Sequence, residues 1–234
     1  MNFLLFAPAD PEGARISLAA RAVEELLPAT SLDLTLSAAD ALTPVGDREQ
    51  MMRDTAQRQE VPILTDRDRD HPVLFSGAYW PAIVAPGGKL LLQLILQTSR
   101  ITGSTLAGDL LGRLGDALHA YWGVATPRAA ASTIAAQVIH DPARDSPPPG
   151  LPALQSWSPQ VDPAVPSLLG WWNYWPREAI ERLGTLPPNA ISLPSGAVAW
   201  SVTDEPLDLS RAEHLTALAD AYARWPRIGN RQSL

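Results

Sequence analysis

The chain has 234 residues, of which 46% are hydrophobic and 18% charged, a balance typical of a folded globular protein. It contains no cysteine, which excludes disulfides, thiol catalysis and cysteine-ligated metals, and its net charge of −7 argues against nucleic acid or an anionic membrane as the main partner. No apolar run approaches the roughly 18 residues of a membrane span and the first residues lack a basic signal segment, so we expect a cytoplasmic protein.

The first residues predict a strand, a helix and a second strand. Phe3–Phe6 is apolar on both faces, which indicates an interior strand. Apolar residues then recur at helical spacing from Glu12 to Leu27. The alternation at Leu32, Leu34 and Leu36 predicts a half-buried strand. This opening is a β-α-β pattern, which could be parallel if the helix crosses over.

The next segment, from Ala38 to His71, is polar and rich in charge. A short helix is predicted for Gln50–Gln59. Val61–Leu64 is interpreted as an edge strand, because proline is excluded from central strands. Val73–Tyr79 predicts a further short strand.

A leucine-rich strand and two helices are predicted for the middle of the chain. Leu90–Gln97 alternates between a fully apolar face and a partly polar face. A helix capped at Ser104 or Thr105 is expected to carry its apolar stripe as far as Trp122. Pro127 is expected to open a second helix.

Proline dominates the stretch that follows. Residues from His140 to Pro166 carry eight of the 23 prolines, which forbids a helix and favours extended chain. A disordered linker is one interpretation, but interleaved apolar residues such as Leu154 and Trp157 favour a strap across the protein. We therefore predict one domain over residues 1–234, with a proline-rich strap at 140–168.

The aromatic stretch Leu168–Ile180 is the least ordinary part of the sequence. Three of the eight tryptophans and one of the four tyrosines lie within Trp171–Trp175. They form either a plug that locks the strap onto the core or a recognition patch, and we favour the plug because buried aromatic residues outnumber functional ones.

The C-terminal part predicts a short helix, a hairpin and a last helix. The short helix ends at Gly184, the hairpin spans residues 191–202, and a Ser210–Glu213 capping box opens the last helix. Together the elements predict an α+β fold: a mixed, mainly antiparallel sheet with helices packed on it, in a single domain.

The sequence does not match the catalytic motifs considered next. There is no G-x-S-x-G motif, and the Pro-Gly-Gly-Lys run at 86–89 lacks the spacing of a phosphate-binding loop. Three glycines lie inside the long predicted helix, where they indicate close packing on a neighbouring element: Gly108, Gly112 and Gly115. We therefore predict a protein that is not an enzyme.

The sequence also lacks a complete metal-binding pattern. The four histidines have no ligand spacing among them. Asp66, Asp68 and Asp70 begin like a calcium loop, but His71 stands where that loop needs glycine, and Arg67 offsets the negative field. We predict no metal and no cofactor.

Four pieces of the chain, in order, resemble a bacterial family described only as a domain of unknown function: Ala120–Pro127, Pro149–Leu154, Leu169–Trp175 and Asp204–Leu209. More distantly, the Trp-x-Asn-Tyr block before a late hairpin and terminal helix is similar to immunity proteins of polymorphic toxin and type VI secretion systems, of the immunity family fifty-two type. That resemblance implies a cytoplasmic, non-enzymatic α+β protein that binds a cognate toxin, in that family often a nuclease of restriction-endonuclease type.

The leading hypothesis is a non-catalytic immunity or interaction protein that neutralises a cognate toxin through an acidic surface, without direct nucleic-acid or membrane contact. Its candidate residues are steering acids and aromatic anchors: Asp66, Asp68, Asp70, Asp204, Glu205, Asp208, Trp171, Trp172 and Tyr174. The alternative is a small-ligand-binding protein or enzyme with an aromatic pocket around Trp171–Tyr174, where Asn173, Arg177 or Glu178 would supply polar groups. A scaffold subunit of a larger assembly is a third hypothesis.

Overall fold

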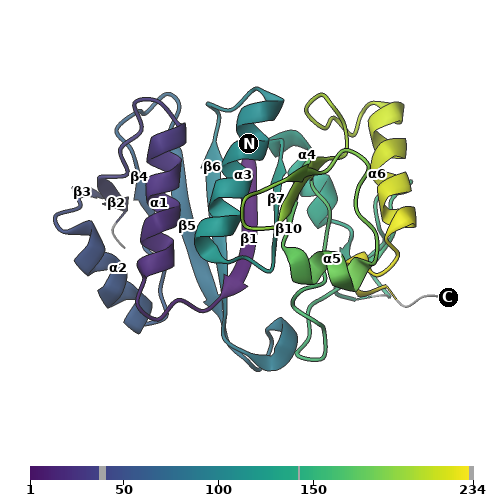
Figure 1. Cartoon of the computed structure of the whole chain (residues 1–234), viewed down its shortest axis with the longest axis horizontal. Coiled ribbons are helices and arrows are strands. Elements are labelled where there is room, and N and C mark those ends of the chain that lie inside the picture. Colours follow the sequence, from purple (N-terminus) through teal and green to yellow (C-terminus); the bar gives the residue numbers. More distant parts are fainter. Residues whose placement is uncertain (37–40, 142, 232–234) are drawn as a thin grey trace.

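One antiparallel sheet runs through the computed structural model, which describes residues 1–36, 41–141 and 143–231 (Figure 1). Every strand pairing within this sheet is antiparallel. From one edge to the other, the strands are β11 (Ile191–Ser192), β12 (Val198–Ser201), β10 (Trp172–Trp175), β7 (Trp122–Thr126), β1 (Asn2–Pro8), β6 (Leu91–Thr98), β5 (Val73–Trp80), β4 (Leu64–Thr65), β2 (Leu34–Leu36) and β3 (Leu42–Pro44).

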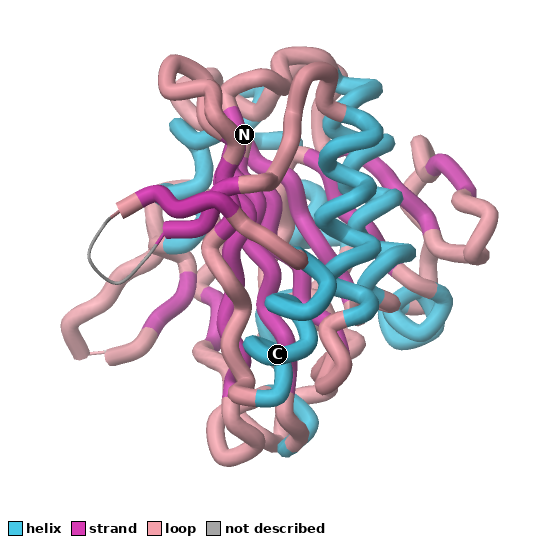
Figure 2. Tube along the Cα trace, turned by 90° about the vertical axis from the view of Figure 1, so that its left-hand side faces the viewer, coloured by secondary structure: helices cyan, strands magenta, loops and turns pink. Residues whose placement is uncertain are grey.

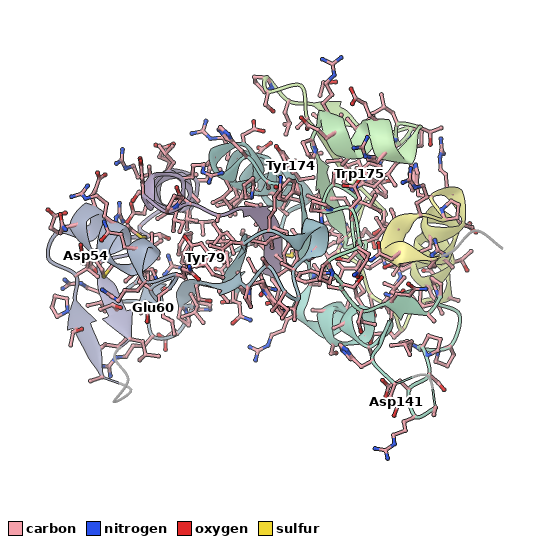
Figure 3. The ribbon with its side chains drawn as sticks, turned by 90° about the horizontal axis from the view of Figure 1, so that it is seen from below. Asp54, Glu60, Tyr79, Asp141, Tyr174 and Trp175 are labelled. Atoms are coloured by element: carbon pink, nitrogen blue, oxygen red, sulfur yellow. The ribbon has the colours of Figure 1, made fainter. Side chains whose placement is uncertain are left out.

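Helices cover the sheet unevenly. On one face lie α1 (Ala14–Leu26), α2 (Arg48–Gln57) and α3 (Ser104–Leu118), and the short α5 (Arg177–Leu183) follows β10 (Figures 1 and 3). Towards the β12 end lie α4 (Arg128–Ala135) and α6 (Ala212–Arg224), with the 3-10 turns η1 (Pro86–Gly88) and η2 (Ile228–Asn230) in loops. A small parallel pair, β8 (Val138–Ile139) with β9 (Leu154–Gln155), follows α4. The predicted α+β fold in one domain is confirmed.

The opening strand is interior, as predicted, but the β-α-β pattern is not a parallel unit. β1 pairs with β6 and β7, whereas β2 pairs with β3 and β4 at the far end of the sheet. The two strands are therefore never neighbours. Alternation along a strand predicts burial, but the pairing partners come from distant parts of the chain.

The long helix predicted to reach Trp122 ends earlier. α3 stops at Leu118, and His119 closes it with a left-handed φ of 51°. Trp122–Thr126 instead forms the fully buried strand β7, which pairs with β1 on one side and β10 on the other. Pairing with two strands outweighs the helical spacing that the apolar residues also satisfy. The second predicted helix is confirmed as α4.

Two further local predictions are wrong. β4 lies between β2 and β5 and is not an edge, and Pro62 precedes its paired residues, so no ladder bond is lost. Ser210 does not cap α6: its hydroxyl donates to Asp208 Oδ1, and Arg211 is the N-cap. The edge strand β3 was not predicted, and residues 37–40, within the stretch predicted to be polar, lie outside the described residues.

The aromatic stretch is itself a strand, β10, which the sequence did not predict. Its Trp175 packs edge-on against Trp200 and Trp225, with ring centroids 5.0 Å apart in each pair. These indoles join β10, β12 and α6 into one cluster. In the predicted strap, Leu154 is fully buried and pairs through β9, while Trp157 is half-buried over the sheet.

The predicted close packing of the α3 glycines is confirmed. A Cβ on Gly108 would lie 2.9 Å from the ring of Trp172, and one on Gly115 would lie 2.6 Å from the ring of Tyr174. Gly112 faces Leu193 in the same way. The glycine side of α3 therefore lets the aromatic side chains of β10 approach the helix backbone.

Replacing Gly115 by alanine is expected to lower the free energy of unfolding by about 1–2 kcal/mol. Overpacking against Tyr174 costs about 1–3 kcal/mol and exceeds the roughly 1 kcal/mol by which alanine favours a helix. Urea denaturation followed by circular dichroism measures the difference. Gly46→Ala is the control, because a Cβ there meets nothing within 4 Å. A Gly115→Ala protein at least as stable as the parent contradicts the packing.

Candidate functional site

One face of the sheet is left open between β1 and β3. Residues directly opposite each other on antiparallel strands point to the same side. Ser76 lies opposite Ile95, which lies opposite Leu4, so this row runs across β5, β6 and β1. Figures 2 and 3 show α1, α2 and α3 on the opposite side of these strands, and no described helix lies over this row.

The open face continues to the β3 edge, and it combines apolar side chains with the polar Ser76, Gln93 and Gln97. Leu36 lies opposite Leu42, and Leu34 lies in register with Leu74 through Thr65. Leu42 is 46% exposed, and the other leucines are half-buried. We call the side chains of this surface, Leu4, Leu34, Leu36, Leu42, Leu74 and Ile95, the open face. An apolar surface of this kind is typical of a binding site for another protein.

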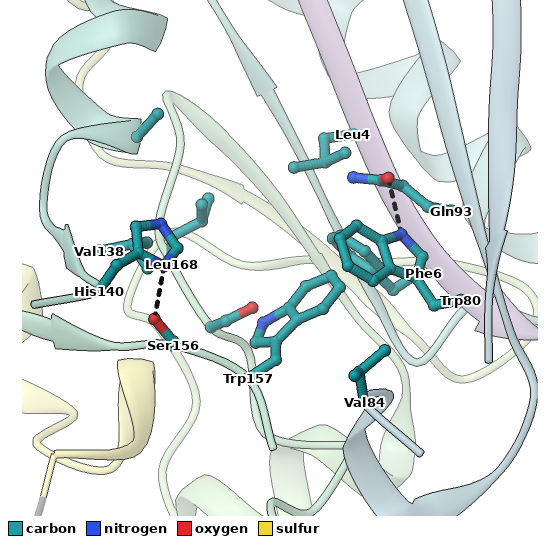
Figure 4. Close-up of a pocket in the computed structure, with 12 residues that line it drawn as sticks. Leu4, Phe6, Trp80, Val84, Gln93, Val138, His140, Ser156, Trp157 and Leu168 are labelled. Atoms are coloured by element: carbon teal, nitrogen blue, oxygen red, sulfur yellow. Dashed lines mark hydrogen bonds between the residues drawn. The ribbon is translucent and has the colours of Figure 1, made fainter. Parts of the chain in front are cut away.

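A pocket of about 440 Å³ lies at the end of the open face where Leu4 and Gln93 stand (Figure 4). Its aromatic wall is built from three separate segments. Trp157, from the proline-rich segment, lies edge-on to Phe6 of β1 and to Trp80 of β5, with ring centroids 4.2 and 5.2 Å apart. Val84, in the loop after β5, borders the pocket beside the exposed Ile83.

The pocket also contains a few polar groups. Trp80 Nε1 donates to Gln93 Oε1 at 2.9 Å. Ser156 Oγ lies 3.0 Å from the carbonyl oxygen of Ile139 and 2.9 Å from His140 Nδ1. The serine has one proton, so both contacts are satisfied only if the imidazole carries its proton on Nδ1 and donates to the serine. In that arrangement, His140 is not a base for Ser156.

Ser167 is the unsatisfied group of this pocket. The residue is only 5% exposed, and its Oγ is buried without a hydrogen-bond partner among the described residues. Buried hydroxyls are nearly always bonded, because leaving one unpaired is unfavourable. Ser167 thus places an unpaired hydroxyl in the wall of this pocket.

The predicted aromatic anchors lie elsewhere and are buried. Trp171 is fully buried and donates through Nε1 to the carbonyl oxygen of Thr203. Trp172 and Tyr174 point towards α3, where their polar atoms bond Ser104 and Asp116. Burial, and then the charge of Asp116, raises the pKa of Tyr174 well above its usual value. In this conformation the three side chains serve packing, which is the interpretation that the sequence favoured.

The polar groups expected beside those anchors do not converge. Asn173 is fully buried and bonds the backbone of Gly170. Arg177 pairs with Glu181 on the exposed side of α5. Glu178 does border a cavity, of about 640 Å³, that Tyr174 also lines. The pocket whose wall contains Phe6, Trp80 and Trp157 lies elsewhere, and these three residues are far apart in the sequence.

The six candidate acids form two separate groups. Asp66, Asp68 and Asp70 follow β4, whereas Asp204, Glu205 and Asp208 follow β12. The sheet order β12-β10-β7-β1-β6-β5-β4 puts six strand spacings between these strands, or roughly 29 Å at about 4.8 Å each. The sequence could not show this separation, because it depends on the strand order. The acids do not form one surface.

The first group is largely engaged within the protein. Asp66 is buried, ion-paired with Arg100, and accepts the Val73 N–H at 3.1 Å. Asp68 also pairs with Arg100, and hydrogen bonds from the backbone of His71 and Asp70, together with Arg100, lower its pKa. Asp70 is exposed, and its carboxylate forms no ion pair among the described residues. Asp66 and Asp68 therefore organise the loop before β5.

The second group is exposed and retains excess negative charge. Arg211 pairs with Glu205 and with Glu213. The Ser210 hydroxyl and backbone N–H lower the pKa of Asp208, and Asp204 is exposed. The segment 204–213 thus holds four carboxylates and one arginine, which leaves a local acidic surface near the start of α6.

No described group of three or more His, Asp or Glu side chains is arranged to hold a metal ion. In the same described ranges, no helix is both long and apolar enough to cross a bilayer. The signal that pointed to the open face was the partly polar side predicted for Leu90–Gln97, which carries Gln93 and Ile95. The pocket had no sequence signal, because its three aromatic residues are contributed by separate segments.

Comparison with known proteins identifies a family that matches the sequence and a solved structure with a similar fold. The family described as "Domain of unknown function (DUF5953)" matches residues 12–233. A solved structure, "Pseudomonas aeruginosa T6SS protein PA0821", is similar with a TM-score of 0.60 and 10% identity, over 98% of this chain and 76% of that chain. At this identity the likeness concerns the fold alone. No curated protein matches the sequence.

Proposed function

We propose that this chain, which belongs to the DUF5953 family, is a non-catalytic interaction protein associated with a type VI secretion system. More specifically, it acts as an immunity protein that binds and neutralises a cognate toxin. The observation that carries the proposal is the open face, a set of apolar side chains on the side of the sheet opposite α1, α2 and α3. Burying such a surface against a partner is favourable.

The fold relative supports the secretion context. That protein is named as a T6SS protein, and its fold extends over nearly the whole of this chain. Similar folds host unrelated functions, so the likeness supports the proposal only together with the surface. The Trp-x-Asn-Tyr block, now placed in β10, keeps its value as a resemblance to immunity proteins and not as a contact site.

Charge supports a basic partner. The net charge of −7 would attract a basic protein such as a nuclease, which presents positive charge to its own substrate. Asp204, Glu205 and Asp208 remain the candidates for steering, because they are exposed with excess negative charge. Asp66 and Asp68 are not among the candidates for steering, because their carboxylates already form ion pairs with Arg100.

The test is co-expression with the product of the adjacent gene. We expect that product to be toxic alone, to be tolerated together with this chain, and to co-purify with it. Ile95→Lys places a charge in the middle of the open face and should weaken the complex at least 30-fold, the scale of a central hot-spot residue.

Leu18→Lys is the matched control, because Leu18 is 49% exposed on α1, away from the open face. It should leave the affinity unchanged, and thermal unfolding should confirm that both variants remain folded. A harmless gene product, or a complex that survives Ile95→Lys as well as it survives Leu18→Lys, contradicts the proposal.

A further inference from the structure

The pocket formed by Phe6, Trp80 and Trp157 has features that a flat protein interface does not require. Its volume of about 440 Å³ falls within the roughly 300–1,000 Å³ of sites for small molecules. It is lined mainly by apolar side chains, and the strap residue Trp157 partly covers it. We propose that this pocket binds a small, neutral, flat organic molecule, such as a phenol or another aromatic alcohol, with its hydroxyl directed at Ser167.

The walls determine the shape and apolar character of the ligand. Trp80 and Trp157 are half-buried indoles set edge-on to each other, with the buried ring of Phe6 behind Trp157, and such indoles accept a further ring by edge or face contact. Leu4, Val84 and Leu168 complete the apolar lining. A ring system buried here would leave water for a mostly hydrocarbon surface, which favours binding.

The absence of formal charge determines the neutrality of the ligand. The residues that line the pocket include no Asp, Glu, Lys or Arg. His140 is the one titratable residue among them. A charged ligand entering such a site would lose its hydration without gaining an ion pair, which is strongly unfavourable.

Two polar atoms determine where the hydroxyl of the ligand binds. Ser167 Oγ is buried and has no partner, so it can donate to, or accept from, a ligand hydroxyl. Gln93 holds the Trp80 N–H through Oε1, which leaves its amide nitrogen free to donate. A single polar group on an otherwise apolar molecule therefore meets the hydrogen-bonding capacity of this site.

The test uses 2-naphthol, titrated into the isolated chain by calorimetry. We expect saturable one-to-one binding, and about fivefold weaker binding to Ser167→Ala, the scale of one neutral hydrogen bond. Naphthalene, which lacks the hydroxyl, should compete equally well for both proteins. Val138→Trp, which fills the pocket, should abolish binding of both compounds.

Ser195→Ala is the matched control, because Ser195 is an exposed serine that bonds Asp116 and borders the separate 640 Å³ cavity. It should bind 2-naphthol like the parent chain. The proposal is overturned by lack of saturable binding to the parent, by unchanged binding to Ser167→Ala or Val138→Trp, or by an equal loss in Ser195→Ala. The partner is absent from this experiment, so its outcome is independent of the proposed toxin binding.

Discussion

Trp175→Ala is expected to lower the free energy of unfolding by about 3–5 kcal/mol, the usual cost of removing a buried tryptophan. Trp175 is 1% exposed and contacts two further indoles, so truncation leaves a cavity between β10, β12 and α6. Neither neighbouring ring can fill that space without leaving its own contacts. Trp200 and Trp225 then keep only the contact with each other, at a centroid distance of 5.0 Å.

Urea denaturation followed by far-ultraviolet circular dichroism measures this effect, since tryptophan fluorescence itself changes with the substitution. Ile191→Ala is the control, because Ile191 is an apolar side chain that is 55% exposed on β11. This substitution should lower the free energy of unfolding by less than about 0.5 kcal/mol. If the aromatic stretch were a recognition patch, Trp175→Ala would instead reduce partner binding with little change in stability. That result would reverse the assignment of β10 to the core.

The sequence predicted elements better than it predicted their partners. Periodicity located α1, α2, α5 and the β11–β12 hairpin, because helix spacing and turn residues are local signals. It failed at Trp122–Thr126, where Trp122 continues the helical stripe of α3 but begins a fully buried central strand. It failed again at Trp172–Trp175, where bulky aromatic residues suggested a plug without revealing that both neighbouring strands pair with them.

Site residues were harder to predict for the same reason. Asp66, Asp68 and Asp70 stand out in the sequence, but the carboxylates of Asp66 and Asp68 interact with Arg100, which lies about thirty residues further along the chain. The open face needs the strand order β3 to β1, and the pocket needs Phe6, Trp80 and Trp157 in contact.

Arg100→Met is expected to lower the free energy of unfolding by about 3 kcal/mol, at the lower end for breaking a buried ion pair. The Asp66 side chain is 2% exposed, so without the guanidinium its charge stays buried with only the Val73 N–H as a donor. Arg100 also donates to the Thr30 hydroxyl at 2.6 Å and to the carbonyl oxygen of His71 at 2.9 Å. The side chain therefore ties the loop before β5 to the segment between α1 and β2.

A double-mutant cycle separates the buried charge from the lost contacts. Asp66→Asn removes the charge, so the Asp66→Asn/Arg100→Met protein should be more stable than Arg100→Met alone by about 1–2 kcal/mol. Arg67→Met is the control, because the Arg67 side chain is 73% exposed in its pair with Asp33. This substitution should lower the free energy of unfolding by less than about 1 kcal/mol. An Arg100→Met protein as stable as Arg67→Met would free Asp66 and Asp68 from their structural role and return them to the surface that steers a basic partner.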